Sequence, residues 1–258
     1  MSCAASSLWS IPACSSSPGV RTGALGIVAL FLVVFGFFYI DAQYLQDVKG
    51  YSALLTGVCI LPIAVVVPYA SARSTSLAQR IGSRATTIIG LLLLAGAIAA
   101  LSFATAPTPY TLYAVLLAVA GTGMGLAMPP LSGTIVHALP PTHAGLGAGL
   151  NSTTREFGSA LGVAVPSTVL TSRFASHLPT AVRDLPGGHA QAVEHSITAA
   201  LNHANSIADP DVRTHLLHAT HAAFTSGTSL GLRIGVALLL LTTIAVALQH
   251  PNRLKEAA

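Results

Sequence analysis

The chain has 258 residues, of which 52% are hydrophobic and 8% are charged. A soluble domain carries about 25% charged residues, so this composition excludes an ordinary water-soluble protein and indicates that lipid is the main solvent. The formal net charge is +4, but the basic residues are spread along the chain rather than gathered in one patch, and we expect no nucleic-acid partner.

The first half of the chain predicts a tail and four membrane helices. Residues 1–22 lack both the basic start and the apolar core of a secretory signal, so we expect a disordered tail. A helix needs about 20 apolar residues to cross a hydrocarbon core of about 30 Å. Four runs have the required length: residues 23–45, 51–72, 81–105 and 110–132.

One acidic residue, Asp41, lies near the outer end of the first of these runs. It either accepts protons or lies in the headgroup layer, where a charge costs little.

A fifth segment, residues 144–171, is largely apolar but carries Arg155 and Glu156 side by side. It is either a surface loop or a membrane helix with a polar face. In a helix, Arg155 lies near mid-membrane, where exposure to lipid costs at least about 2.5–3.5 kcal/mol, so we expect it to face a bundle interior. This helix is predicted to line a transport pathway or, alternatively, to hold the bundle through inter-helix hydrogen bonds. Helical spacing groups Arg155 with four further polar residues: Asn151, Ser152, Glu156 and Ser159.

The distribution of Lys and Arg favours a crossing helix at residues 144–171, because cytoplasmic flanks attract these residues. With six spans and a cytoplasmic N-terminus, the cytoplasmic side receives Arg21, Arg73, Arg80, Arg84, Arg253 and Lys255. With five spans this bias weakens. We therefore predict a multi-pass protein of the plasma membrane with both termini cytoplasmic. The remaining segments are a long outer loop over residues 172–225, a sixth helix over 226–248 and a tail over 249–258.

Three glycine pairs have the GxxxG spacing that lets helix backbones approach closely. Such spacing is common in glycine-rich sequence, but it predicts helix packing in the fourth and fifth spans. The pairs are Gly121 and Gly125, Gly145 and Gly149, and Gly158 and Gly162.

The predicted outer loop holds seven of the ten histidines. Among them, His215, His218 and His221 have a spacing of three residues. No Cys or well-placed carboxylate accompanies them, so we expect exposed His-rich helices and no metal site.

Three strings of residues point to one family. They are "YIDAQYLQDVKGYSALLTGVCILPIAVVV" at 39–67, "GTGMGLAMPPLSG" at 121–133 and "GLGAGLNSTTREFGSALGVAV" at 145–165. In this order they resemble the C-terminal half of the fourteen-span drug:proton antiporters of the major facilitator superfamily. The resemblance runs from about Gly23 to Leu248 and includes the "QYLQ" turn that begins at Gln43, which we place in the transport pathway. It implies an all-α membrane protein with six transmembrane helices forming one half of a major facilitator bundle.

The resemblance implies a transporter rather than an enzyme. In the intact family, this architecture exports small amphipathic compounds across the lipid bilayer in exchange for protons, and it uses no other cofactor. Substrate binds between two halves of such folds, so we expect the chain to need an N-terminal transporter half or a homodimer partner. The alternative is a non-functional truncated remnant or an assembly partner.

Two further strings lead to separate predictions. "TSLAQRIGSR" at residues 75–84 resembles the superfamily's cytoplasmic loop motif at Arg80, Gly82 and Arg84, and departs from it at Thr75 and Gln79. It is predicted to be a conformational latch or, alternatively, only to fix topology through its arginines. The "PLSG" string at 130–133 suggests a remote alternative, an intramembrane serine protease, but a serine without a reachable base is a poor nucleophile.

Overall fold

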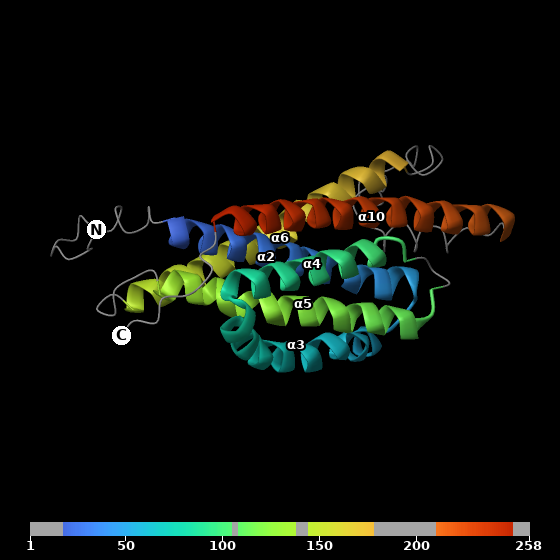
Figure 1. Ribbon diagram of the computed structural model, residues 1–258. Coiled ribbons are helices and arrows are strands. Elements are labelled where there is room, and N and C mark those ends of the chain that lie inside the picture. The colour runs from blue at the N-terminus through green and yellow to red at the C-terminus, as the bar shows by residue number, and fades with distance from the viewer. Residues whose placement is uncertain (1–17, 105–107, 138–143, 178–209, 250–258) are drawn as a thin grey trace.

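The computed structural model describes residues 18–104, 108–137, 144–177 and 210–249. These residues form six long α-helices and one short π-helix, with no strand among them (Figure 1). The predicted all-α fold is confirmed. In chain order the elements are α2 (Pro18–Gln43), the π-helix η2 (Tyr44–Val48), α3 (Ala53–Ile81), α4 (Ser83–Leu101), α5 (Tyr110–His137), α6 (Ala144–His177) and α10 (Pro210–Gln249).

Five of the described helices are long and apolar enough to cross a membrane: α2 continued by η2, α3, α4, α5 and α10. The remaining helix, α6, has 34 residues and therefore sufficient length. Its Asn, Ser, Thr, Arg and Glu side chains lower its hydropathy, so α6 is not among the five. Composition thus identifies five of the six predicted spans.

The helices are longer than the apolar runs that predicted them. α2 begins at Pro18, inside the segment predicted to be a disordered tail, and the "QYLQ" string continues the helix instead of forming a turn. The loop predicted over residues 172–225 is helical at both ends, because α6 runs to His177 and α10 begins at Pro210. Residues 178–209, which hold most of that loop, lie outside the described residues, as do residues 1–17 and 250–258 of the predicted tails.

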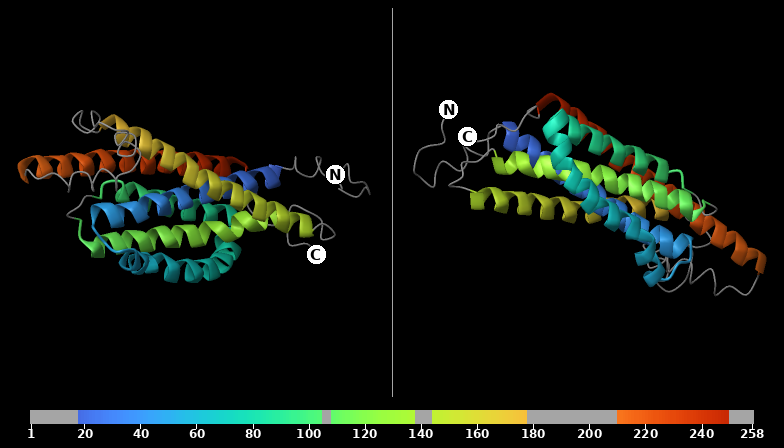
Figure 2. Two further views of the ribbon diagram at one scale, coloured as in Figure 1. Left: turned by 180° about the vertical axis from the view of Figure 1, so that it is seen from behind. Right: turned by 60° about the horizontal axis from the view of Figure 1, so that its bottom comes forward.

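α2 lies in the middle of an elongated bundle and contacts α5, α6 and α10 (Figure 1). α6 crosses α2 on one side of the bundle, as the left view of Figure 2 shows. α5 packs between α3 and α4, and α4 also contacts α10. α3 lies at the edge of the bundle, and its candidate span is the least buried of the five.

Glycines allow the backbones of α2 and α6 to touch. A Cβ atom added to Gly158 would lie 2.7 Å from the carbonyl oxygen of Val28, and one added to Gly162 would lie 2.6 Å from that of Leu32. From the other side, a Cβ atom on Gly36 would lie 2.7 Å from Cγ of Pro166. These distances are too short for any side chain, so this crossing requires glycine at all three positions.

The other two predicted glycine pairs differ from each other. Gly121 and Gly125 of α5 face α3, where added Cβ atoms would lie 3.3 Å from Cα of Ile63 and 2.7 Å from Cβ of Ala70. Added Cβ atoms at Gly145 and Gly149 would meet nothing within 4 Å. The packing role predicted for Gly145 and Gly149 therefore has no contact within the described part of the bundle and stays a prediction.

Polar contacts join the helices at both ends of the bundle. At one end Gly82, with φ of 92°, is the single residue between α3 and α4. Beside it the guanidinium group of Arg84 donates a hydrogen bond to the backbone carbonyl of Ala247 in α10. At the other end Lys49 Nζ donates to the carbonyl of Thr108, 2.6 Å away, which ties the α2–α3 connection to the segment before α5.

Candidate functional site

Asp41 is a carboxylate enclosed by the bundle. It lies in the last turn of α2 and is 1% exposed. One carboxylate oxygen, Oδ1, accepts a hydrogen bond from the hydroxyl of Tyr113 in α5. The other, Oδ2, is buried and has no hydrogen-bond partner. The Asp41 side chain therefore lies between helices of the bundle.

Aromatic rings surround this carboxylate. Tyr44 stacks on Tyr113 with ring centroids 5.8 Å apart and an angle of 17° between the planes. Tyr44 is the first residue of η2, and single π-helical turns of this kind occur frequently at functional sites. The hydroxyl of Tyr110, one turn before Tyr113 in α5, donates to the carbonyl of Cys59 in α3 at 3.1 Å. Tyrosines of α5 therefore hold this helix to the end of α2 and to α3.

A small cavity of about 20 Å³ adjoins Asp41. Five helical elements contribute to it: α2, η2, the end of α4, α5 and α10. Its polar side chains are Asp41, Tyr44, Ser102, Tyr113 and Thr228. Its other lining residues are Phe37, Ile40, Leu101, Ala104 and Leu232. The cavity thus combines one carboxylate with hydroxyl groups in an apolar wall.

Arg155 forms a second polar position, on α6. Its guanidinium lies 4.8 Å from the centroid of the Phe31 ring of α2, a cation–π contact that keeps the charge against the bundle. Asn151, one turn earlier, is half-buried, and its Oδ1 is buried without a hydrogen-bond partner. Ser152 and Glu156 are exposed, and the half-buried Ser159 donates a hydrogen bond to the carbonyl of Glu156 at 2.8 Å. The polar strip of α6 therefore has an inner side at Asn151 and Arg155 and an outer side at Ser152 and Glu156.

The candidate pathway residues do not form one site. Phe31, which contacts Arg155, and Asp41 are ten residues apart on α2, or about 15 Å at the helical rise. Gln43, the last residue of α2, is half-buried and does not line the cavity beside Asp41. The sequence did not indicate Tyr113, which donates a hydrogen bond to Asp41, or Thr228, which lines the same cavity. The one signal was Asp41 itself, since a carboxylate in an apolar span needs polar neighbours.

The motif residues Arg80, Gly82 and Arg84 lie at two helix ends instead of in a loop. Arg80 is exposed in the last turn of α3, and Arg84 is in the first turn of α4. Gly82 alone connects the two helices. The segment is therefore a tight corner, and the contact between Arg84 and α10 gives it a packing role that goes beyond fixing topology.

Comparison with known proteins identifies the family of this helical bundle. Residues 5–163, more than half of the chain, match the Major Facilitator Superfamily. The chain belongs to the Major Facilitator Superfamily. Its family is one of membrane transporters and not of enzymes.

Named relatives within the superfamily share part of their length with this chain. The chain is 33% identical to the multidrug resistance protein Stp of Mycobacterium tuberculosis over 162 residues, which cover 61% of the chain and 30% of Stp. It is 33% identical to the methylenomycin A resistance protein of Streptomyces coelicolor over 154 residues, 58% of the chain and 32% of that protein. It is 28% identical to the multidrug efflux pump LfrA of Mycolicibacterium smegmatis over 227 residues, 85% of the chain and 44% of LfrA. The chain thus spans less than half the length of these relatives.

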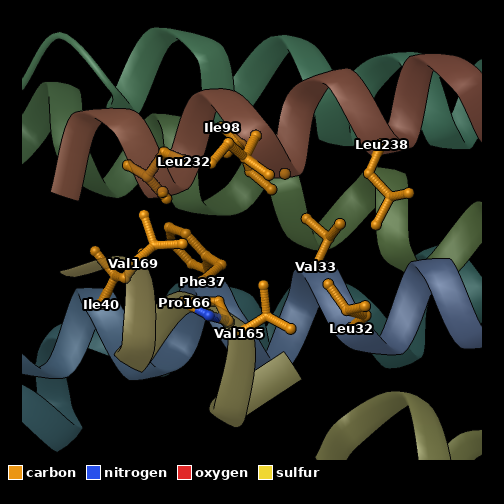
Figure 3. A pocket seen from close by; sticks show the side chains of 14 residues that line it. Leu32, Val33, Phe37, Ile40, Ile98, Val165, Pro166, Val169, Leu232 and Leu238 are labelled. Atoms are coloured by element: carbon orange, nitrogen blue, oxygen red, sulfur yellow. The ribbon is translucent and has the colours of Figure 1, made fainter. Parts of the chain in front are cut away.

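This Major Facilitator chain also has an apolar pocket of about 30 Å³ between α2, α6 and α10. Figure 3 shows Phe37, Pro166 and Leu232 converging on it from these three helices. None of the lining residues is charged. The pocket therefore offers space for apolar groups but no group that could bind a charged or strongly polar substrate.

The helices that cover this Major Facilitator bundle leave large apolar side chains outside. On α3 the exposed fractions are 84% for Leu54, 51% for Leu61 and 70% for Val65. On α6, Phe157 is 59% exposed and lies beside the outer polar strip. In a membrane, such faces contact lipid or another helical unit.

Proposed function

We propose that this chain is one six-helix half, the C-terminal one, of a plasma-membrane transporter that exports small amphipathic compounds in exchange for protons. The observation that carries the proposal is the family match, together with relatives named for drug resistance or efflux. The order of the helices and the buried carboxylate support it further. No covalent chemistry is needed, because transport of this kind requires binding and a change of access.

The proposal requires α6 to cross the membrane although its hydropathy is low. α6 packs along α2, which is a clear apolar span, with glycine contacts at Gly158 and Gly162. Arg155 contacts Phe31 and is half-buried, so the helix avoids most of the cost of exposing a charge to lipid. The outer side chains Ser152 and Glu156 then face a wet pathway and not lipid.

The pathway is proposed to form between this bundle and a second six-helix unit. The apolar faces of α3 and α6 would provide the surface that contacts the second unit, since small and apolar residues mediate helix association in membranes. The second unit is an N-terminal half or another copy of this chain. The polar strip of α6 lies where a substrate would pass between the two units.

An efflux assay in a pump-deficient host tests the proposal. The chain is expressed by itself and together with a complementary N-terminal half, and the accumulation of a fluorescent cationic dye is followed with and without a proton gradient. Arg155→Ala removes the charge beside Phe31, and Arg213→Ala, an exposed arginine near the start of α10, is the matched control.

We expect proton-dependent efflux that survives Arg213→Ala and is lost in Arg155→Ala, with equal membrane insertion of all variants. Efflux by the chain expressed by itself would favour the homodimer over the split transporter. If every combination inserts into the membrane and none exports the dye, the transport proposal fails and the remnant interpretation replaces it.

A further inference from the structure

The apolar pocket between α2, α6 and α10 opens on the outside of the bundle. Val33 and Phe37 of α2 form its buried wall (Figure 3). Two other lining side chains, Val165 of α6 and Ile234 of α10, are 41% and 44% exposed. Gly235 also lines the pocket and has no side chain to fill it. The pocket is therefore a groove that a molecule beside the bundle can enter.

The mouth of this groove lies at the depth of the membrane hydrocarbon. The lining residues of α10 fall within 231–238, inside the candidate span Phe224–Leu248. Those of α2 fall within 32–40, inside the candidate span Arg21–Val48. Spans of this length cross a hydrocarbon core of about 30 Å. Lipid acyl chains therefore surround the mouth and have direct access to the groove.

An exposed cation, Arg233, lies next to the groove residues of α10. Its guanidinium is 5.4 Å from the centroid of the Phe103 ring. α4 has 19 residues, or about 28 Å, so it is just long enough to cross the hydrocarbon core. Phe103 lies two residues beyond the end of α4 at Leu101, and therefore marks the boundary between hydrocarbon and headgroups.

The guanidinium of Arg233 is available to an anion at this boundary. Within the described part of the chain its one interaction is the contact with the Phe103 ring, and no carboxylate pairs with it. Arginine has five N–H donors in a planar fork that matches a phosphate group. A ring contact leaves these in-plane donors free, so phosphate oxygens can accept hydrogen bonds from them.

The cation and the groove are spaced as the two parts of a lipid molecule. Ile98 lines the groove and precedes Phe103 by five residues, or about 8 Å along a helix. The groove thus begins just below the level at which Arg233 meets Phe103. Its volume of about 30 Å³ holds two or three water-sized groups, which suits a stretch of flexible chain and not a rigid ring system.

We propose that this groove binds one membrane phospholipid, with its phosphate at Arg233 and part of one acyl chain between α2, α6 and α10. Charge complementarity selects the headgroup, and the uncharged lining selects the chain. The site is formed by this bundle and needs no second unit. It goes beyond the proposed function, because it binds a component of the membrane and not a transported compound.

Photo-crosslinking locates the acyl chain. The full-length chain is placed in phosphatidylcholine nanodiscs with a phosphatidylglycerol that carries a diazirine on one acyl chain, and labelled residues are mapped by mass spectrometry. We expect labelling at the groove residues within 165–169 and 231–238 to exceed labelling at Leu241 and Ile244. These two side chains of α10 are exposed but do not line the groove, so they report ordinary contact with lipid.

Filling the groove should abolish the excess. In Gly235→Leu the added Cβ would lie 3.3 Å from Cγ1 of Val33, and the rest of the side chain would occupy the groove. Labelling of the groove should then fall to the level at Leu241. Gly96→Leu is the matched control, because this exposed glycine of α4 has nothing within 4 Å of an added Cβ and does not line the groove.

Removing the cation tests the headgroup. Arg233→Gln should lower groove labelling by phosphatidylglycerol roughly tenfold, because it removes a charged hydrogen-bond donor. Labelling by a diacylglycerol with the same diazirine chain and no phosphate should not change. The control is Arg73→Gln, which removes another exposed arginine with a ring contact, 4.9 Å from Tyr69 on α3.

Three results would overturn the inference. Equal labelling of the groove and of Leu241 would show ordinary contact with lipid. An unlabelled groove beside a labelled Leu241 would show that protein covers it. Displacement of the label by an excess of amphipathic dye, with no effect of Arg233→Gln, would assign the groove to a transported compound. If Gly235→Leu fails to insert, phosphatidylglycerol and diacylglycerol labelling of the unchanged chain and of Arg233→Gln decides. A chain that exports no dye can still bind the lipid, so the two proposals fail separately.

Discussion

Replacing Gly162 with alanine should weaken the contact between α2 and α6. The added Cβ would lie 2.6 Å from the carbonyl oxygen of Leu32 and 3.0 Å from its Cα. Both are backbone atoms of a helix, which cannot rotate away as a flexible side chain can. The two helices must therefore separate by several tenths of an ångström along their crossing, and the packing on either side of Gly162 loosens with them.

The size of the effect follows from two opposing terms. Overpacking of this kind costs about 1–3 kcal/mol. Replacing a glycine inside a helix by alanine gains about 0.5–1 kcal/mol, because the unfolded chain loses conformational freedom. Gly149→Ala on the same helix should be stabilised by the reduced freedom of the unfolded chain without any overpacking, since an added Cβ there meets nothing within 4 Å. The difference in unfolding free energy between the two variants should therefore be about 1–3 kcal/mol.

Unfolding in mixed micelles with increasing denaturing detergent, followed by circular dichroism, measures this difference. Gly149→Ala should be as stable as the unchanged chain or slightly more stable, and Gly162→Ala should unfold at a lower detergent fraction. Equal midpoints for the two variants would show that the close crossing of α2 and α6 does not contribute to stability, and the reasoning from backbone contact would be refuted.

Three further predictions concern single contacts. Arg84→Ala should lower the unfolding free energy by about 1–2 kcal/mol in the same assay, because it removes the charged hydrogen bond to α10, whereas the exposed Arg80→Ala should have little effect. A double-mutant cycle of Arg155→Ala and Phe31→Leu should give a coupling free energy of about 0.5–2 kcal/mol for unfolding. A coupling free energy near zero would show that the cation–π contact does not stabilise the bundle. Ser52→Ala should cost about 1 kcal/mol, measured by thermal unfolding, because the Ser52 side chain caps α3 by accepting from Leu55 N at 3.3 Å.

The class of fold could be predicted from the sequence because it depends on composition and the length of apolar runs. The helix ends could not, because backbone hydrogen bonds continue a helix after its apolar residues stop. α3 shows this: its apolar run ends near Ala72, yet the helix continues through Arg73 and Arg80 to Ile81. The same effect extends α6 and α10 into the segment predicted to be a loop.

The packing and the candidate site needed the structure, because each depends on residues distant in sequence. GxxxG spacing is the same at Gly145–Gly149 and at Gly158–Gly162, and only the position of α2 distinguishes them. For Asp41 the sequence left two environments open. Its partner Tyr113 is 72 residues away in another helix, and no periodicity along α2 could identify it.

The contacts at the two ends of the bundle limit how it can move. At one end Gly82 joins α3 directly to α4, and Arg84 fastens α4 to α10; at the other, Lys49 holds the α2–α3 connection to Thr108. A tilt of any one of these helices is passed to the next, so internal sliding within the bundle is resisted from both ends. The five helices joined by these contacts would then move together, and a large displacement would take place between them and whatever lies against their outer faces.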